Sequence, residues 1–217
     1  MAFEKLQESQ PQVMQLLENS IRKDRLSHAY LFEGEKGTKK FEFGLYFAMR
    51  LLCTEEDKPC GTCHNCRRIQ HHTHPNVFII EPVKNMIKKQ QIQDLQREFN
   101  KTSVEPGPKI YIIRSIDQIH VSAANSLLKF LEEPHPNIYA ILTTENINRI
   151  LPTIISRSQI VQFTSLPSKI VYEELVEEGY PEEISHIISN LTTATGEAQR
   201  KIKVNLHCRI DRSQGFK

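Results

Sequence analysis

The chain has 217 residues, of which 39% are hydrophobic, enough to bury the core of one large domain or of one and a half ordinary ones. Its 28 basic and 26 acidic residues nearly cancel, so charge alone indicates neither a nucleic-acid surface nor a membrane surface. It has no apolar run near the roughly 20 residues that span a bilayer, and its first residues lack a secretory signal pattern. We therefore expect a globular, cytoplasmic protein with no membrane partner, whose other partners must be inferred from motifs.

Five short apolar runs have the length and content of β-strands, and they lie at residues 29–32, 77–80, 110–113, 138–142 and 160–163. Helical spacing of apolar residues separates several of them, as between Ala124 and Leu131, where Pro134 then ends the helix. Strands that alternate with helices predict an α/β domain with a parallel sheet covered on both faces.

The pattern changes to helices alone after residue 164, with apolar positions that include Ile170, Leu175, Ile184 and Ile188. We therefore predict one domain over residues 1–164 and a small helical domain over residues 165–217. This second domain looks too short to close on itself, so we expect the chain to stop before a further C-terminal domain.

The stretch GEKGTKKF, residues 34–41, follows the first strand and leads into a helix, where a phosphate-binding loop belongs. An active loop reads G-x-x-x-x-G-K-[ST], in which the second glycine allows close approach and the hydroxyl residue holds Mg²⁺. Gly34, Gly37 and Lys40 remain, whereas Lys39 replaces the second glycine and Phe41 replaces the hydroxyl residue. The pattern predicts a degenerate loop; weak anion binding by Lys40, or a simple basic turn, are both compatible with it.

The acidic pair that completes a nucleotide site is also missing. The strand at residues 109–113 runs into Arg114 and Ser115, where carboxylates that serve Mg²⁺ would stand. Asp117 lies two residues further on, and we expect it to cap a helix or face solvent. The loss of two independent magnesium-binding elements predicts an inactive relative of an ATPase, with no ATP bound to this chain.

Four of the five cysteines, Cys53, Cys60, Cys63 and Cys66, lie within fourteen residues. Two consecutive C-x-x-C steps with a cysteine upstream are typical of a closed, structural zinc site with four thiolate ligands. A histidine could instead supply the fourth ligand, the candidates being His64, His71, His72 and His74, and another thiophilic metal could replace zinc. Cys208 is the odd thiol and is not an expected ligand.

The stretch KIYIIRSIDQIHVSAANSLLKFLEEPHPNIYAILTTENINRILPTIISRSQIVQF, which begins at residue 109, closely resembles the AAA+ subunits of the bacterial DNA polymerase III clamp loader. SHAYLFEG at residues 27–34 and the cysteine cluster resemble the same family, so that the resemblance covers about residues 20–165. It implies a RecA-like AAA+ core with an inserted zinc module, a helical lid domain, and a C-terminal collar domain before which we expect this chain to stop. Gamma/tau subunits keep intact loops, whereas the delta-prime type loses the ATPase; the degenerate pattern here resembles delta-prime.

The resemblance also assigns roles to particular residues. Ser156-Arg157-Ser158 falls on the family's Ser-Arg-Cys motif, whose arginine reaches the γ-phosphate of ATP held by a neighbouring subunit. Arg157 is therefore expected to act in trans as an arginine finger, although Ser158 departs from the motif. Thr143-Thr144 falls at the family's phosphate sensor, expected here to be a relic. The implied partners are gamma/tau and delta subunits and, through the assembly, the sliding clamp and primed DNA.

Two other functions compete with an inactive clamp-loader subunit. One is an active ATPase of the gamma/tau type, against which the missing hydroxyl and acidic pair argue. The other is a zinc-containing nucleic-acid-binding module that would use the basic residues Arg67, Arg68, Lys88 and Lys89. These charges are scattered among acids without an aromatic stacking platform, and a solvated surface explains them more simply.

Overall fold

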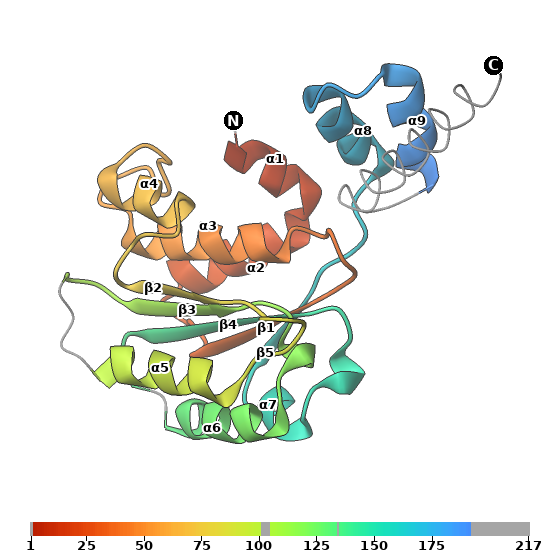
Figure 1. Cartoon of the computed structure of the whole chain (residues 1–217). Coiled ribbons are helices and arrows are strands. Elements are labelled where there is room, and N and C mark those ends of the chain that lie inside the picture. The colour runs from red at the N-terminus through yellow and green to blue at the C-terminus, as the bar shows by residue number, and fades with distance from the viewer. Residues whose placement is uncertain (1, 101–104, 134, 192–217) are drawn as a thin grey trace, which may run out of the picture. The chain divides into compact units, whose positions relative to one another are not determined.

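The computed structural model describes residues 2–100, 105–133 and 135–191, which divide into two compact units (Figure 1). The larger unit comprises residues 12–33 and 40–162. The smaller unit comprises residues 1–11, 34–39 and 163–217, as far as these are described. The phosphate-loop segment is thus divided, since residues 34–39 belong to the smaller unit and α3 of the larger unit begins at Lys40.

The larger unit is built on a five-stranded, fully parallel sheet with the order β2-β3-β4-β1-β5. Its strands match the five predicted runs to within two residues at either end: β1 (Ala29–Glu33), β2 (Val77–Ile80), β3 (Lys109–Ile113), β4 (Ile138–Thr144) and β5 (Gln159–Gln162). Leu31 of β1 pairs with Leu142 on one side and with Ile160 on the other. The predicted parallel α/β sheet is therefore confirmed.

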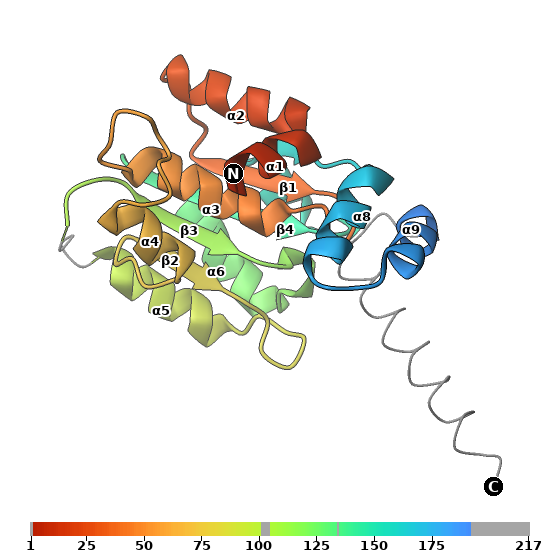
Figure 2. The same cartoon turned by 90° about the horizontal axis from the view of Figure 1, so that it is seen from above.

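Helices cover both faces of this sheet, as the sequence predicts (Figures 1 and 2). One face carries α2 (Pro11–Arg22), α3 (Lys40–Leu52) and α4 (His64–Gln70), and the other carries α5 (Lys89–Asn100), α6 (Val121–Glu132) and α7 (Pro152–Ile155). Two short 3₁₀ helices, η1 (Ile116–Gln118) and η2 (Ile147–Arg149), follow β3 and β4. As expected, α6 ends just before Pro134.

An aromatic cluster fixes β3 against the helices on its face. Phe99 of α5 lies with its ring centroid 5.2 Å from Phe78 of β2, 5.5 Å from Tyr111 of β3 and 5.0 Å from Phe130 of α6. The Phe99 contacts with Tyr111 and Phe130 are edge-on, the geometry that aromatic quadrupoles favour. These ring contacts pack β3 against α5 and α6, and Arg114 directly follows the carboxyl end of β3.

The smaller unit contains α1 (Ala2–Ser9), α8 (Ser168–Glu177) and α9 (Glu182–Leu191). The last two helices pack through a small apolar cluster of Leu166, Val171, Leu175 and Ile188. The predicted change to helices after residue 164 is therefore seen as far as residue 191. The domain boundary at residues 164 and 165 stays a prediction. None of the helices among the described residues is long and apolar enough to cross a membrane.

Gly34 is required for packing, and this gives a first prediction. A Cβ placed on Gly34 would lie 2.5 Å from the backbone oxygen of Phe163, closer than real Cβ atoms approach a backbone atom. We expect Gly34→Ala to lower the free energy of unfolding by about 1–3 kcal/mol, as overpacking typically does. Thermal and urea unfolding would measure it, with the exposed Lys36→Ala as the control. Equal stability of Gly34→Ala and wild type would contradict the close approach.

Candidate functional site

The segment of residues 34–39 is held by contacts with protein groups. Gln10, which is 3% exposed, donates from Nε2 to the Thr164 oxygen at 2.5 Å and to the Thr38 oxygen at 3.5 Å. Its Oε1 accepts from the Thr164 N–H at 3.2 Å. The buried side chain of Gln10 thus joins the loop to the start of the C-terminal helices within the smaller unit.

Lys39 stands where an active loop has its second glycine, and it adopts the backbone conformation expected of that glycine. Its φ is +67°, in the left-handed region that residues with a Cβ enter only at a cost. Its Nζ lies 2.5 Å from Oε1 of Glu174 on α8. The ion pair directs the Lys39 charge to a carboxylate of the protein, so the residue at this position contacts α8 within the smaller unit.

Phe41 and Arg114 occupy the two positions that serve magnesium in an active site, and in the larger unit they bind each other. The Arg114 guanidinium carbon lies 4.4 Å from the centroid of the Phe41 ring, a cation–π arrangement. Arg114 also pairs with Glu81 at 2.5 Å, and the Phe41 ring meets His72 edge-on at 5.5 Å. An aromatic ring and a guanidinium offer no ligand to Mg²⁺, which takes oxygen ligands.

Lys40 keeps the position of the loop lysine but is 8% exposed. Burial lowers the pKa of its amine, while the carboxylates of Glu145, Glu42, Asp117 and Glu33 act in the opposite direction. Four negative side chains of the larger unit therefore act on this single amine. They lower the positive potential that Lys40 could present to a phosphate.

The two threonines at the end of β4 are used to fix the neighbouring strand ends. Thr144 Oγ1 donates to Asp117 Oδ1 at 3.0 Å, and Thr143 Oγ1 accepts from the Ser115 N–H at 3.1 Å. Asp117 is half-buried and bonded, which differs from the helix-capping or solvent-facing role expected from the sequence. These hydrogen bonds give Thr143 and Thr144 a structural function.

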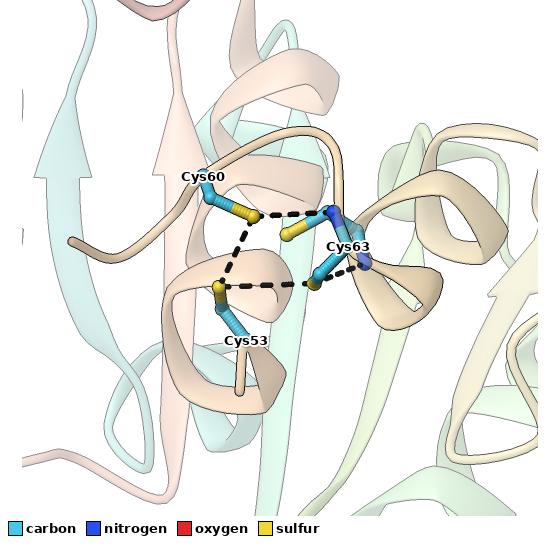
Figure 3. Close-up of side chains that lie close together, drawn as sticks. Cys53, Cys60 and Cys63 are labelled. Carbon is cyan, nitrogen blue, oxygen red and sulfur yellow. Dashed lines mark hydrogen bonds between the residues drawn. The ribbon is translucent and has the colours of Figure 1, made fainter. Parts of the chain in front are cut away.

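The four predicted metal ligands are brought together, and their sulfur atoms all lie within 4.8 Å of one another. Figure 3 shows Cys53, which follows α3, with Cys60 and Cys63 of the connection to α4. The Cys53 sulfur lies 3.7 Å from that of Cys60 and 3.9 Å from that of Cys63. Tetrahedral coordination with metal–sulfur bonds of about 2.3 Å requires sulfurs about 3.8 Å apart, so the cluster can hold such an ion.

Backbone N–H groups also prepare this cluster for a metal. The N–H groups of Cys63 and Thr62 point at the Cys60 sulfur from 3.2 and 3.4 Å and lower its pKa to about 6. Burial instead raises the pKa of Cys53 and Cys66. A cation among the four sulfurs would offset that cost, because metal ligation stabilises the thiolate form.

None of the candidate histidines joins the four cysteines as a ligand among the residues that the structure describes. His64 Nε2 lies 3.0 Å from Nη1 of Arg68, and the buried His74 lies 3.7 Å from Glu105. The four cysteines thus lie together without a histidine among these residues, an arrangement that is compatible with the four-cysteine interpretation. Cys208 lies outside the described residues.

Arg157 follows α7 and is held at the surface of the larger unit. Its Nη1 donates to the Thr153 oxygen at 3.0 Å and to Ser156 Oγ at 3.3 Å. Its Nη2 pairs with Oε1 of Glu132 at 3.1 Å, and 35% of its side chain is exposed. The contact with Glu132 could not be predicted from the sequence pattern. The finger role of Arg157 stays a prediction.

The sequence was compared with protein families and with curated proteins, and the matches include DNA polymerase III subunits. The sequence model of the family described as DNA polymerase III, delta subunit matches residues 9–167. The delta-prime subunit of Bacillus subtilis DNA polymerase III is 46% identical over 91% of this chain and 60% of that protein. The Haemophilus influenzae delta-prime subunit is 31% identical over 68% of this chain and 46% of that protein. The chain thus spans about half to three-fifths of the length of these relatives.

Among solved structures, a DNA polymerase III gamma subunit-related protein from Thermotoga maritima has a TM-score of 0.53 at 20% identity, over 82% of this chain and 58% of that one. At that identity the likeness shows the fold alone. The fold is that of an AAA+ core, with a phosphate loop that departs from the active pattern at Lys39 and Phe41. The chain belongs to the DNA polymerase III delta-subunit family, and it is of the delta-prime type.

The contact between Phe41 and Arg114 gives a second prediction. In a double-mutant cycle of Phe41→Ala and Arg114→Ala, we expect a coupling free energy of about 0.5–1 kcal/mol, the value of a partly exposed cation–π pair. Urea unfolding of the four proteins would measure it. The control pairs Phe41→Ala with Arg97→Ala, whose side chain contacts Asp94 on α5, and it should show no coupling. Equal coupling in both cycles would contradict a specific contact.

The cysteine cluster gives a third prediction. We expect the purified protein to carry about one equivalent of a thiophilic metal, and Cys60→Ser or Cys63→Ser to lose it, because three ligands leave a closed site incomplete. Elemental analysis would identify and count the metal. Cys208→Ser is the matched control and should keep a full equivalent. Retention of metal by both ligand variants would rule out this cluster as the site.

Proposed function

We propose that this chain acts as a non-catalytic delta-prime subunit of the DNA polymerase III clamp loader, and that it contributes an arginine to the ATP site of a neighbouring subunit. In this function it binds no ATP of its own. It assembles with gamma/tau and delta subunits, and the assembly places the sliding clamp on primed DNA. The setting is cytoplasmic.

The observation that carries this proposal is the stack of Arg114 on Phe41. In an active site these positions supply the hydroxyl and the carboxylate that serve Mg²⁺. Here the Arg114 guanidinium stacks on the Phe41 ring and pairs with Glu81. Magnesium neutralises charge on the transferred phosphoryl group, so its loss removes a central part of the catalytic machinery. Lys39 adds to this, because its charge pairs with Glu174. Together these contacts support a subunit without ATPase activity, and we propose that it has no polymerase activity either.

Arg157 is the residue that we assign to the neighbour's ATP. A guanidinium suits the role because it stays charged and presents five donors in a planar fork that matches phosphate oxygens. Arginine fingers raise the rate of phosphoryl transfer by about 10³–10⁵ by stabilising charge that develops in the transition state. The partial exposure of Arg157 leaves it accessible to an adjoining subunit.

We assign the cysteine cluster to structural Zn²⁺. Four thiolates fill all positions of a tetrahedral ion and leave none for substrate or water, which distinguishes structural from catalytic zinc. The ion would tie the end of α3, through Cys53, to α4, through Cys66. Its effect would therefore be on the stability of this module and not on any reaction.

The two competing functions have less support. An active ATPase would need Phe41 and Arg114 to be replaced by magnesium ligands. Of the four basic residues named for a zinc-dependent nucleic-acid module, Arg68 pairs with Glu105 at 2.8 Å, whereas Arg67, Lys88 and Lys89 are exposed. Within residues 2–100, 105–133 and 135–191, neither alternative has a structural feature that favours it over the proposed function.

The fourth prediction concerns the ATPase of the reconstituted loader. With Arg157→Ala in the full-length subunit, we expect the rate to fall tenfold or more, equivalent to about 1.4 kcal/mol or above. Arg157→Lys should lose nearly as much, because a lysine cannot reproduce the planar, bidentate contact. The isolated subunit should bind no MgATP by calorimetry.

Arg149→Ala, in η2, is the control for loss of an arginine from the same unit and should keep the wild-type rate. An unchanged rate with Arg157→Ala would end the finger role. Magnesium-dependent ATP binding by the isolated subunit would mean that the loop is functional despite Phe41 and Lys39.

A further inference from the structure

Glu132 is the acidic side chain that contacts the guanidinium of Arg157. Its Oε1 lies 3.1 Å from Nη2 of Arg157, and 46% of the Glu132 side chain is exposed. The two residues come from different elements, because Glu132 is the last residue of α6 and Arg157 follows α7. The pair therefore links two elements on one face of the sheet.

Glu132 lies at the C-terminal end of α6, where a negative charge is not favoured by the helix itself. A carboxylate at the C-terminal end of a helix meets the negative end of the helix dipole, which disfavours its charge. Glu133, the next residue, is exposed and has the same charge, and its backbone N–H closes the helix onto the Lys129 oxygen. Of these two acids, Glu132 is the one whose carboxylate pairs with Arg157.

The backbone around Arg157 is anchored independently of its side chain. Ile154 is fully buried, and its backbone oxygen accepts from the Arg157 N–H at 3.2 Å and from the Ser158 hydroxyl at 2.9 Å. A long arginine side chain on a fixed backbone still has four rotatable bonds. Contacts with the guanidinium itself are therefore needed to hold it in one place.

Three such contacts exist among the described residues. Nη1 donates to the Thr153 oxygen and to Ser156 Oγ, and Nη2 forms an ion pair with Glu132. Since a guanidinium has five N–H donors, these contacts leave donors for an incoming phosphate. Thr153 and Ser156 lie within four residues of Arg157, so Glu132 supplies the contact from a separate element that limits swinging of the side chain.

We propose that Glu132 is a positioning residue for Arg157, which holds the guanidinium in a defined orientation before a phosphate reaches it. This inference rests on the proposed finger role. Ordering the side chain in advance reduces the entropy that must be lost when the guanidinium engages the phosphate. Glu132 itself touches no nucleotide in this scheme.

The first test measures the motion of the Arg157 side chain in the 217-residue protein by itself. NMR of ¹⁵N-arginine-labelled protein reports the motion of the Arg157 Nε–H group, assigned by its disappearance in Arg157→Lys. We expect Glu132→Gln to increase that motion and to speed exchange with water. Glu133→Gln removes the same charge from the adjacent residue and should leave the signal as in wild type.

The second test uses the full-length subunit in the reconstituted loader. We expect Glu132→Gln to lower kcat of the ATPase by about threefold to tenfold, the scale of losing one partly exposed ion pair that orients a reacting group. Assembly affinity and KM for ATP should stay unchanged. Glu133→Gln should match wild type, and Glu132→Gln combined with Arg157→Ala should be no slower than Arg157→Ala alone.

The outcomes separate this inference from the function on which it rests. If Arg157→Ala is slow but Glu132→Gln matches wild type, the finger stands and the positioning role is overturned. If Glu132→Gln is faster than wild type, the carboxylate competes with phosphate, and the positioning role is again overturned. If Arg157→Ala itself matches wild type, the finger role fails and the inference fails with it.

Discussion

The contact between Arg114 and Phe41 is the physical constraint on which the functional account depends. A parallel sheet brings the carboxyl end of β3 and the start of α3 to the edge where an ATPase assembles its magnesium site. Here the cation at that edge is a protein side chain, held by an aromatic face and by Glu81. A guanidinium supplies positive charge but coordinates no water and no phosphoryl oxygen as a metal does. The fold is thus kept while these two positions form a packing contact with each other, in line with the proposed absence of ATPase activity.

In the smaller unit, residues 34–39 of the loop are likewise held by contacts with other protein groups. Gly34 remains because a side chain there would strike the Phe163 backbone, and Lys39 keeps a left-handed conformation while it pairs with Glu174. Gln10 ties Thr38 to Thr164 from a buried position. These contacts join the loop to the segment that leads into α8. They give the loop a structural role in the fold, which is one reason for part of its sequence pattern to be kept even if it binds no nucleotide.

Much of the larger unit could be predicted from the sequence because its signals are local. Strands buried on both faces are continuous apolar runs, so residues 29–32 and 110–113 were recognisable. The spacing of Cys60, Cys63 and Cys66 predicts a cluster that could hold a metal within one short segment, and their sulfurs do lie close together. The pairs Phe41 with Arg114 and Arg157 with Glu132 could not be predicted in this way, since each joins residues distant in sequence. The bonded state of Asp117 was missed for the same reason, because its partner Thr144 lies on another strand.

A cryo-EM reconstruction of the loader, assembled with the full-length subunit and a non-hydrolysable ATP analogue, tests the central claim most directly. We expect no nucleotide at residues 34–41, with Arg114 still stacked on Phe41. We also expect a guanidinium nitrogen of Arg157 at about 3 Å from a γ-phosphate oxygen in the adjoining subunit, the distance of a charge-assisted hydrogen bond. Nucleotide density beside Lys40, or an Arg157 side chain directed away from every bound phosphate, would contradict the proposed function.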